Sequence, residues 1–151
     1  MKRLVCLLLI AVLFCACGGT QKAYGEDFAK RVADAWEEKG YLDDMVQFTD
    51  ADLLDYYGID LSLCKSGVGF VDAMGYTKEA IVIVAEEATA KEIETLLADH
   101  VASQKEAFRS YDAEAFRIAE NAVMLREGEL VVMIVSPDAQ AMLETLRGVT
   151  P

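Results

Sequence analysis

The chain has 151 residues, of which 26 are Asp or Glu and 14 are Lys or Arg, so its formal net charge is −12 at pH 7. A chain of this length fits one domain. Its negative charge argues against binding to nucleic acid or to an anionic lipid surface through bulk charge, so we expect no nucleic-acid partner.

The first 16 residues have the features of a targeting segment. Lys2 and Arg3 precede the uncharged run LVCLLLIAVLFCA, which ends at Ala16. A basic start, a short apolar core and a small residue at its end are typical of a secretory signal peptide. The run is shorter than the stretch of about 20 apolar residues that a membrane-spanning helix needs. We therefore expect residues 1–16 to be a signal peptide.

The end of this segment contains the sequence Phe14-Cys15-Ala16-Cys17. It resembles the lipobox of bacterial lipoprotein signals, in which a branched apolar residue, a loosely restricted residue and Ala or Gly precede a Cys. Phe14 departs from this pattern, since Leu is usual there. Cys15 does not fit the anchor position, because bulky Phe14 would then occupy the small-residue position.

The lipobox resemblance implies that Cys17 takes a diacylglyceryl group and becomes the new N-terminus after cleavage behind Ala16. Two acyl chains such as palmitate would then anchor the protein in the cell membrane, facing outside the cytoplasm. The alternative is an ordinary cleaved signal or an uncleaved anchor. Loss of the signal removes two of the 14 basic residues, which takes the net charge from −12 to −14.

The cysteines exclude an internal disulfide in the processed chain. Cys6 and Cys15 leave with the signal and Cys17 is acylated, so only Cys64 remains. Cys64 lies beside Lys65, and a neighbouring cation lowers the pKa of a thiol and makes it reactive. A free cysteine is also often a small buried hydrophobic residue, and the sequence leaves both alternatives open.

The domain begins with two predicted helices, after a short lipidated tether at residues 17–25. In residues 26–39 apolar side chains recur at helical spacing. Thr49 and Asp52 match a capping box, which predicts a second, shorter helix that ends at Gly58.

Two predicted hairpins and three further helices complete the domain. Residues 68–76 alternate in polarity, and residues 80–85 (AIVIVA) are apolar on both faces, as in a central strand. The turn at 77–79 joins them. The other elements, in chain order, are a long helix opened by a capping box at Thr89, a helix capped by Asp112, a hairpin turning at Glu127-Gly128, and a last helix that starts at Ser136-Pro137-Asp138 and runs to about Arg147.

The predicted order of elements is α-α-β-β-α-α-β-β-α. Two hairpins separated by helices favour a single α+β domain over residues 26–151. We expect one antiparallel sheet of about four strands, with helices packed mainly on one face.

Four short motifs follow one another along this domain: YYGID (56–60), the two-strand block ending in AIVIVA, Gln104-x-x-x-Phe108-x-x-Tyr111, and the closing hairpin plus helix. In order and spacing they resemble the family called domain of unknown function 4358, from about Trp36 to Leu146. The resemblance implies a bacterial, extracytoplasmic lipoprotein with an α+β domain. It implies no reaction, because the family has no established activity or catalytic residues.

One polar pair lies on an otherwise apolar stripe of the long predicted helix. It consists of His100, the one histidine of the chain, and Gln104, and Tyr111 continues the same face. A polar pair in this position is typical of hydrogen-bonded residues at the edge of a core. The alternative is that His100, Gln104 and Tyr111 are polar contacts in a ligand groove.

Other chemistry has weak support. A histidine-based metal site needs several ligands at close spacing, and neither Asp99 nor Glu106 shares the face of His100. The aspartates of residues 43–60 have oxygen ligands that suit calcium, but their spacing does not match a calcium-binding loop. The sequence has no nucleophile-elbow, zinc-protease, Cys-x-x-Cys or phosphate-loop motif. We therefore expect no catalytic residue, no metal site and no cofactor.

These observations predict a membrane-anchored, non-catalytic binding or interaction module outside the cytoplasm. Its partner would be an envelope protein or another envelope component. The alternative is a small-ligand carrier with a groove near His100, Gln104 and Tyr111, and an enzyme of unrecognised type is a third, weaker hypothesis.

Overall fold

The computed structural model describes residues 22–73 and 77–151. The predicted signal peptide, residues 1–16, and Cys17 therefore lie outside the described residues, as do Met74 and Tyr76 of the first predicted hairpin. Within the described ranges, no helix combines the length and the apolar character that crossing a bilayer requires.

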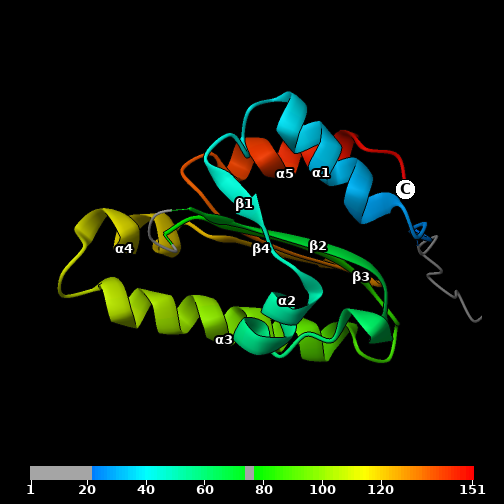
Figure 1. Cartoon of the computed structure of the whole chain (residues 1–151), viewed down its shortest axis with the longest axis horizontal. Helices are drawn as coiled ribbons and strands as arrows, with labels where there is room; N and C mark the ends of the chain where they lie inside the picture. The colour runs from blue at the N-terminus through cyan, green and yellow to red at the C-terminus, as the bar shows by residue number, and fades with distance from the viewer. Residues whose placement is uncertain (1–21, 74–76) are drawn as a thin grey trace, which may run out of the picture.

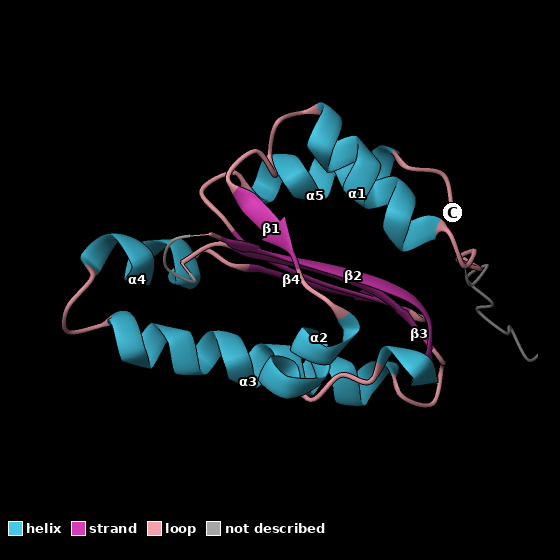
Figure 2. Cartoon of the chain, viewed as in Figure 1, coloured by secondary structure: helices cyan, strands magenta, loops and turns pink. Residues whose placement is uncertain are grey.

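Helices and strands are interspersed along the described chain (Figure 2). The helices are α1 (Phe28–Glu38), α2 (Asp50–Tyr57), α3 (Ala90–Phe108), α4 (Ala113–Glu120) and α5 (Ala139–Gly148), with a short 3-10 helix η1 (Leu61–Leu63). The strands are β1 (Met45–Gln47), β2 (Cys64–Asp72), β3 (Glu79–Ala85), β4 (Val123–Glu127) and β5 (Leu130–Val135).

The strands form one five-stranded sheet in the order β1-β2-β3-β5-β4, and every neighbouring pair is antiparallel. Both predicted hairpins, β2–β3 and β4–β5, are present, and β3 pairs with β5 to join them. Gly128, with φ 60°, lies in the second hairpin turn. The α+β prediction is confirmed, but the sheet has five strands instead of about four, because the short edge strand β1 was not predicted.

Helices cover both faces of the sheet, in contrast to the prediction of one main face (Figure 1). Helices α1 and α5 pack on one face, and α2, α3 and α4 pack on the other. Alternate residues of the central strands enter two separate cores: Val82 and Val132 lie in the core under α1 and α5, whereas Ile83 and Val131 lie in the opposite one. The one-face prediction is wrong because strands that are apolar on both faces need cover on both faces.

Helix α2 has the ends that its sequence predicts. The Thr49 side chain accepts a hydrogen bond from the Asp52 amide, and the Asp52 carboxylate accepts one from the Thr49 amide, which completes the capping box. Gly58 ends the helix with φ 71°, a conformation that favours glycine. These caps fix the position of Tyr57 in the last turn.

The other predicted helix starts agree only in part with the structure. Asp112 caps α4 by accepting hydrogen bonds from two backbone amides, as predicted. Thr89 precedes α3 but makes no capping hydrogen bond, because its hydroxyl donates to the Glu86 carbonyl. Helix α5 begins later than predicted, at Ala139, and Ser136 accepts a hydrogen bond from the Asp138 amide in the turn before it.

Two glycines of β2 let α2 and η1 approach the sheet closely. A Cβ on Gly69 would lie 3.0 Å from side-chain carbons of both Leu53 and Phe48, and one on Gly67 would lie 2.5 Å from Leu61. The space that side chains would fill at these positions is occupied by residues of α2 and the segments beside it. The glycines therefore allow α2 to pack directly on β2.

We expect Gly69→Ala to lower the free energy of unfolding by about 1–3 kcal/mol, since the added methyl group overpacks the contact between α2 and β2. Gly148→Ala is the matched control, because a Cβ there meets no atom within 4 Å and alanine favours the helix. Urea unfolding of both variants provides the measurement. Equal stabilities would contradict the role assigned to Gly69.

Candidate functional site

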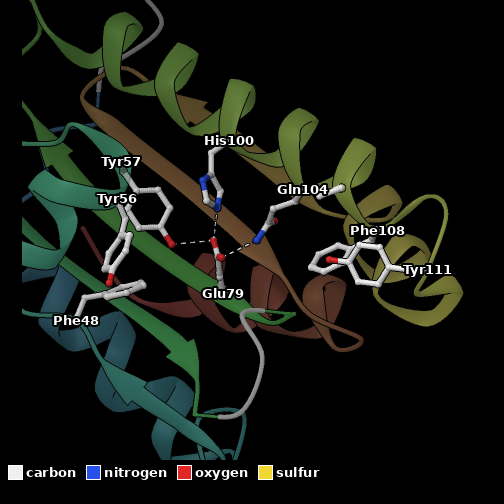
Figure 3. Close-up of a pocket in the computed structure, with 9 residues that line it drawn as sticks. Phe48, Tyr56, Tyr57, Glu79, His100, Gln104, Phe108 and Tyr111 are labelled. Carbon is white, nitrogen blue, oxygen red and sulfur yellow. Dashed lines mark hydrogen bonds and ion pairs between the residues drawn. The ribbon is translucent and has the colours of Figure 1, made fainter.

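A buried carboxylate lies at the start of the central strand β3. Glu79 is 1% exposed, and both of its oxygens accept hydrogen bonds (Figure 3). Tyr57 Oη donates to Oε2 at 2.8 Å, and His100 Nε2 lies 2.8 Å from the same oxygen, to which it donates when it carries the ring proton. Gln104 Nε2 donates to Oε1 at 2.6 Å. A buried charge is costly unless it is hydrogen-bonded in this way.

Three elements bring these groups together. Glu79 lies on the same face of β3 as Ile81 and Ile83, which is the face that α2 and α3 cover. His100 and Gln104 are one helical turn apart on α3, so both point at the strand. The close approach of α2 to β2 places the Tyr57 hydroxyl over the same carboxylate.

The four polar groups lie at the base of a groove of about 390 Å³ with aromatic walls. Phe48, Tyr56 and Tyr57 lie at one end of the groove, and Phe108 and Tyr111 lie at the other, with Glu79, His100 and Gln104 between them (Figure 3). Tyr56 and Tyr111 are 56% and 73% exposed, whereas Phe48 and Phe108 are buried. The groove thus has an aromatic rim in contact with solvent and a buried polar floor.

The rings of each wall pack against one another. At one end the centroid of the Phe48 ring lies 6.2 Å from that of Tyr56 and 5.5 Å from that of Tyr57. At the other end the centroids of Phe108 and Tyr111 are 5.9 Å apart. These edge-to-face and tilted contacts hold the rings in place without a ligand.

The structure brings together all three residues that the sequence placed in a ligand groove. His100, Gln104 and Tyr111 line the same groove. The first interpretation, a hydrogen-bonded polar pair at the core edge, describes His100 and Gln104 as well, because each bonds to Glu79. The two descriptions are therefore compatible.

Sequence reasoning missed Glu79, the centre of the cluster, and assigned it to a turn. It also assigned no site role to Tyr57, Phe48 or Tyr56. One signal was present: Glu79 directly precedes AIVIVA, a strand that is apolar on both faces. A charged residue at the start of such a strand enters a buried environment and needs partners.

Three carboxylates of the acidic stretch at residues 43–60 have partners within the domain. Asp44 forms an ion pair with Lys78, which holds the pKa of the Asp44 carboxyl below its usual range. Asp52 and Asp60 accept hydrogen bonds at the starts of α2 and η1, and these bonds lower the pKa of each carboxyl. Among residues 22–73 and 77–151, no three His, Cys, Asp or Glu side chains converge on a point where they would hold a metal ion.

Cys64 is half-buried, and its neighbour Lys65 does not activate it. Burial, together with the negative charges of Asp60 and Glu86, raises the pKa of the Cys64 thiol. The Lys65 ammonium instead pairs with Glu129 at 2.5 Å. The environment thus favours a protonated, weakly nucleophilic thiol over a reactive one.

Comparison with known proteins gave one match. A family model described as "Domain of unknown function (DUF4358)" matches residues 38–136, which is more than half of the chain. No curated protein and no solved structure matches the chain significantly. The matched range includes Glu79 and all the other residues that line the groove.

We expect Glu79→Gln to lower the free energy of unfolding by about 2–3 kcal/mol, since the amide removes a charged acceptor and turns N–H groups toward donors. Glu86→Gln is the matched control, because Glu86 is exposed just beyond the same strand and should change stability by less than about 0.5 kcal/mol. Urea unfolding measures both. A Glu79→Gln variant as stable as Glu86→Gln would contradict a charged, hydrogen-bonded Glu79.

Proposed function

The chain belongs to the family described as Domain of unknown function (DUF4358), and we propose that it is a non-catalytic binding module whose ligand lies in the aromatic groove over Glu79. The observation that carries this proposal is the combination of an exposed aromatic rim with a polar floor. The groove volume of about 390 Å³ is within the range of about 300–1,000 Å³ for small-molecule sites.

The exposed aromatic residues support a binding role. Single exposed apolar side chains are common on protein surfaces, but Tyr56 and Tyr111 lie at opposite ends of one groove. Tyrosine buries a large area on binding and loses little conformational entropy, which makes it frequent in binding sites. A ligand that bridges the two ends would cover both rings.

The polar floor is better suited to positioning than to catalysis. Both oxygens of Glu79 already accept hydrogen bonds, so the carboxylate is not poised to take a proton from a substrate. The described lining contains no Ser, Thr, Cys or Lys that would act as a nucleophile. The fixed network instead gives the groove a constant shape and charge.

The location of the module is also part of the proposal. We infer from the N-terminal segment that the protein is a bacterial lipoprotein, held on the outer side of the cell membrane through Cys17. Helix α1 begins at Phe28, so the tether between the anchor and the domain is short. The groove would then face ligands or proteins of the cell envelope.

Replacement of Cys17 by Ala tests the anchor. Cells fed an alkyne analogue of palmitate should label the unaltered chain, and Cys17→Ala should lose the label and leave the membrane fraction. Cys64→Ala is the control and should keep both the label and the membrane location. Labelling of the Cys17→Ala chain would contradict the lipoprotein proposal.

A photo-crosslinking residue at Tyr111 tests the groove. Illumination of cells should attach the ligand at position 111 but not at Lys39, an exposed control position at the end of α1 on the other side of the sheet. Tyr56→Leu, which changes an exposed ring at the opposite end of the groove, should lower the yield at position 111. A small-molecule adduct would identify a ligand carrier and a protein adduct an interaction module, whereas equal yields at both positions would refute the groove proposal.

A further inference from the structure

We propose that the groove selects a cation, namely an ammonium group carried on an aromatic or apolar body. This inference rests on the proposed function, because it names the ligand class for the same groove. Three independent features of the described residues lead to it: the charge of the floor, the direction of its donors, and the faces of the aromatic rings.

The floor of the groove carries a negative charge without a permanent positive one. Glu79 lies beneath the groove, and the described lining contains no Lys or Arg. Its three partners are a phenol, an imidazole and an amide, which are all neutral when the imidazole is unprotonated. Because Glu79 is buried, its charge is weakly screened by solvent and acts on whatever enters the groove.

The hydrogen-bond donors of the floor point at Glu79. The Tyr57 hydroxyl has a single proton, which it gives to Oε2, and His100 Nε2 and Gln104 Nε2 are also directed at the carboxylate. An anionic ligand needs donors or cations directed at it. Binding an anion here would place it against Glu79 and require these donors to turn away.

Of the basic residues beside the groove in sequence, Lys78 and Arg109 are held by other partners, and Lys105 follows Gln104 on α3. Lys78, which precedes Glu79, forms an ion pair with Asp44. Arg109, which follows Phe108, pairs with Glu106 at 3.1 Å and lies over the Phe116 ring at 5.6 Å. Helix α2, which contributes Tyr56 and Tyr57, has three aspartates and no Lys or Arg. The aspartates of α2 therefore add negative charge on that side of the groove.

The aromatic walls favour the same ligand. The face of an aromatic ring carries a partial negative charge, and an ammonium group within about 6 Å of its centroid is attracted by it. The groove has such rings at both ends, with Glu79 between them (Figure 3). An aromatic ammonium compound would place its ring against one wall and its charge above the carboxylate.

Three probes of similar size separate charge from shape: 2-phenylethylamine, 2-phenylethanol and 3-phenylpropionate. Each is titrated into the full-length chain in a non-ionic detergent, which carries no ammonium group, with free probe measured by dialysis. The resonances of His100 and Gln104 report occupation of the groove. The titrations are run at about pH 8, at which an alkylamine keeps its proton. We expect the cation to bind about tenfold more tightly than the alcohol, and the anion most weakly.

Two variants assign the selectivity to the groove. Glu79→Gln should reduce the affinity for the cation to that for the alcohol. Glu86→Gln should leave the ratio of the cation affinity to the alcohol affinity unchanged. Tyr111→Leu changes an exposed residue and preserves the fold, so it serves if Glu79→Gln does not fold. It should lower the ratio about threefold, because it removes one ring but not the apolar surface.

The outcomes distinguish this inference from the proposed function. Tightest binding of the anion, or equal binding of cation and alcohol, would overturn the inference while leaving a ligand groove. A cation preference that survives both Glu79→Gln and Tyr111→Leu would also overturn it. If no probe shifts the His100 and Gln104 resonances at millimolar concentrations, the inference fails, whereas the proposed function fails only if crosslinking at position 111 equals that at Lys39.

Discussion

The burial of the Glu79 carboxylate is the constraint on which the half of the structure around the groove depends. A charge at the start of the central strand is tolerated only if donors replace the water it loses. The chain supplies a donor from α2 and two from α3, so both helices must lie over the beginning of β3. The glycines of β2 make room for α2, and the apolar stripe of α3 holds that helix in place. The same contacts leave a groove between the two helices.

The sequence predicted most helices and both hairpins, because their signals are local. The capping box at Thr49 and the cap at Asp112 could be recognised from a few residues. Strand β1 could not, since three residues at a sheet edge show no usable periodicity and gain their structure by pairing with β2. The prediction of helices on one main face was wrong although its evidence was in the sequence. The strands AIVIVA (80–85) and LVVMIV (130–135) are apolar on both faces, so helices have to cover both faces of the sheet.

Only the site residues on α3 and in the turn that follows it were predicted from the sequence. His100, Gln104 and Tyr111 share a face of α3 and its continuation, so helical spacing was sufficient to find them. Glu79 and Tyr57 are more than twenty positions away in sequence from their partners, and no local pattern contains that information. Sequence adjacency was misleading for Cys64, because the pairing register of β2 shifts between Cys64 and Ser66 and the two neighbouring side chains have different partners. Lys65 consequently pairs with Glu129.

The acidity of the whole chain and the chemistry of the groove favour the same kind of ligand. A net charge of −12 attracts cations from a distance and repels anionic lipid headgroups, although salt screens both effects beyond about 10 Å. Attraction at long range is unselective, so discrimination has to come from the groove, where burial limits screening. There, one fixed carboxylate and two pairs of aromatic rings act over a few ångströms. The charge of the chain thus raises the concentration of cations near the domain, and the groove decides which of them bind.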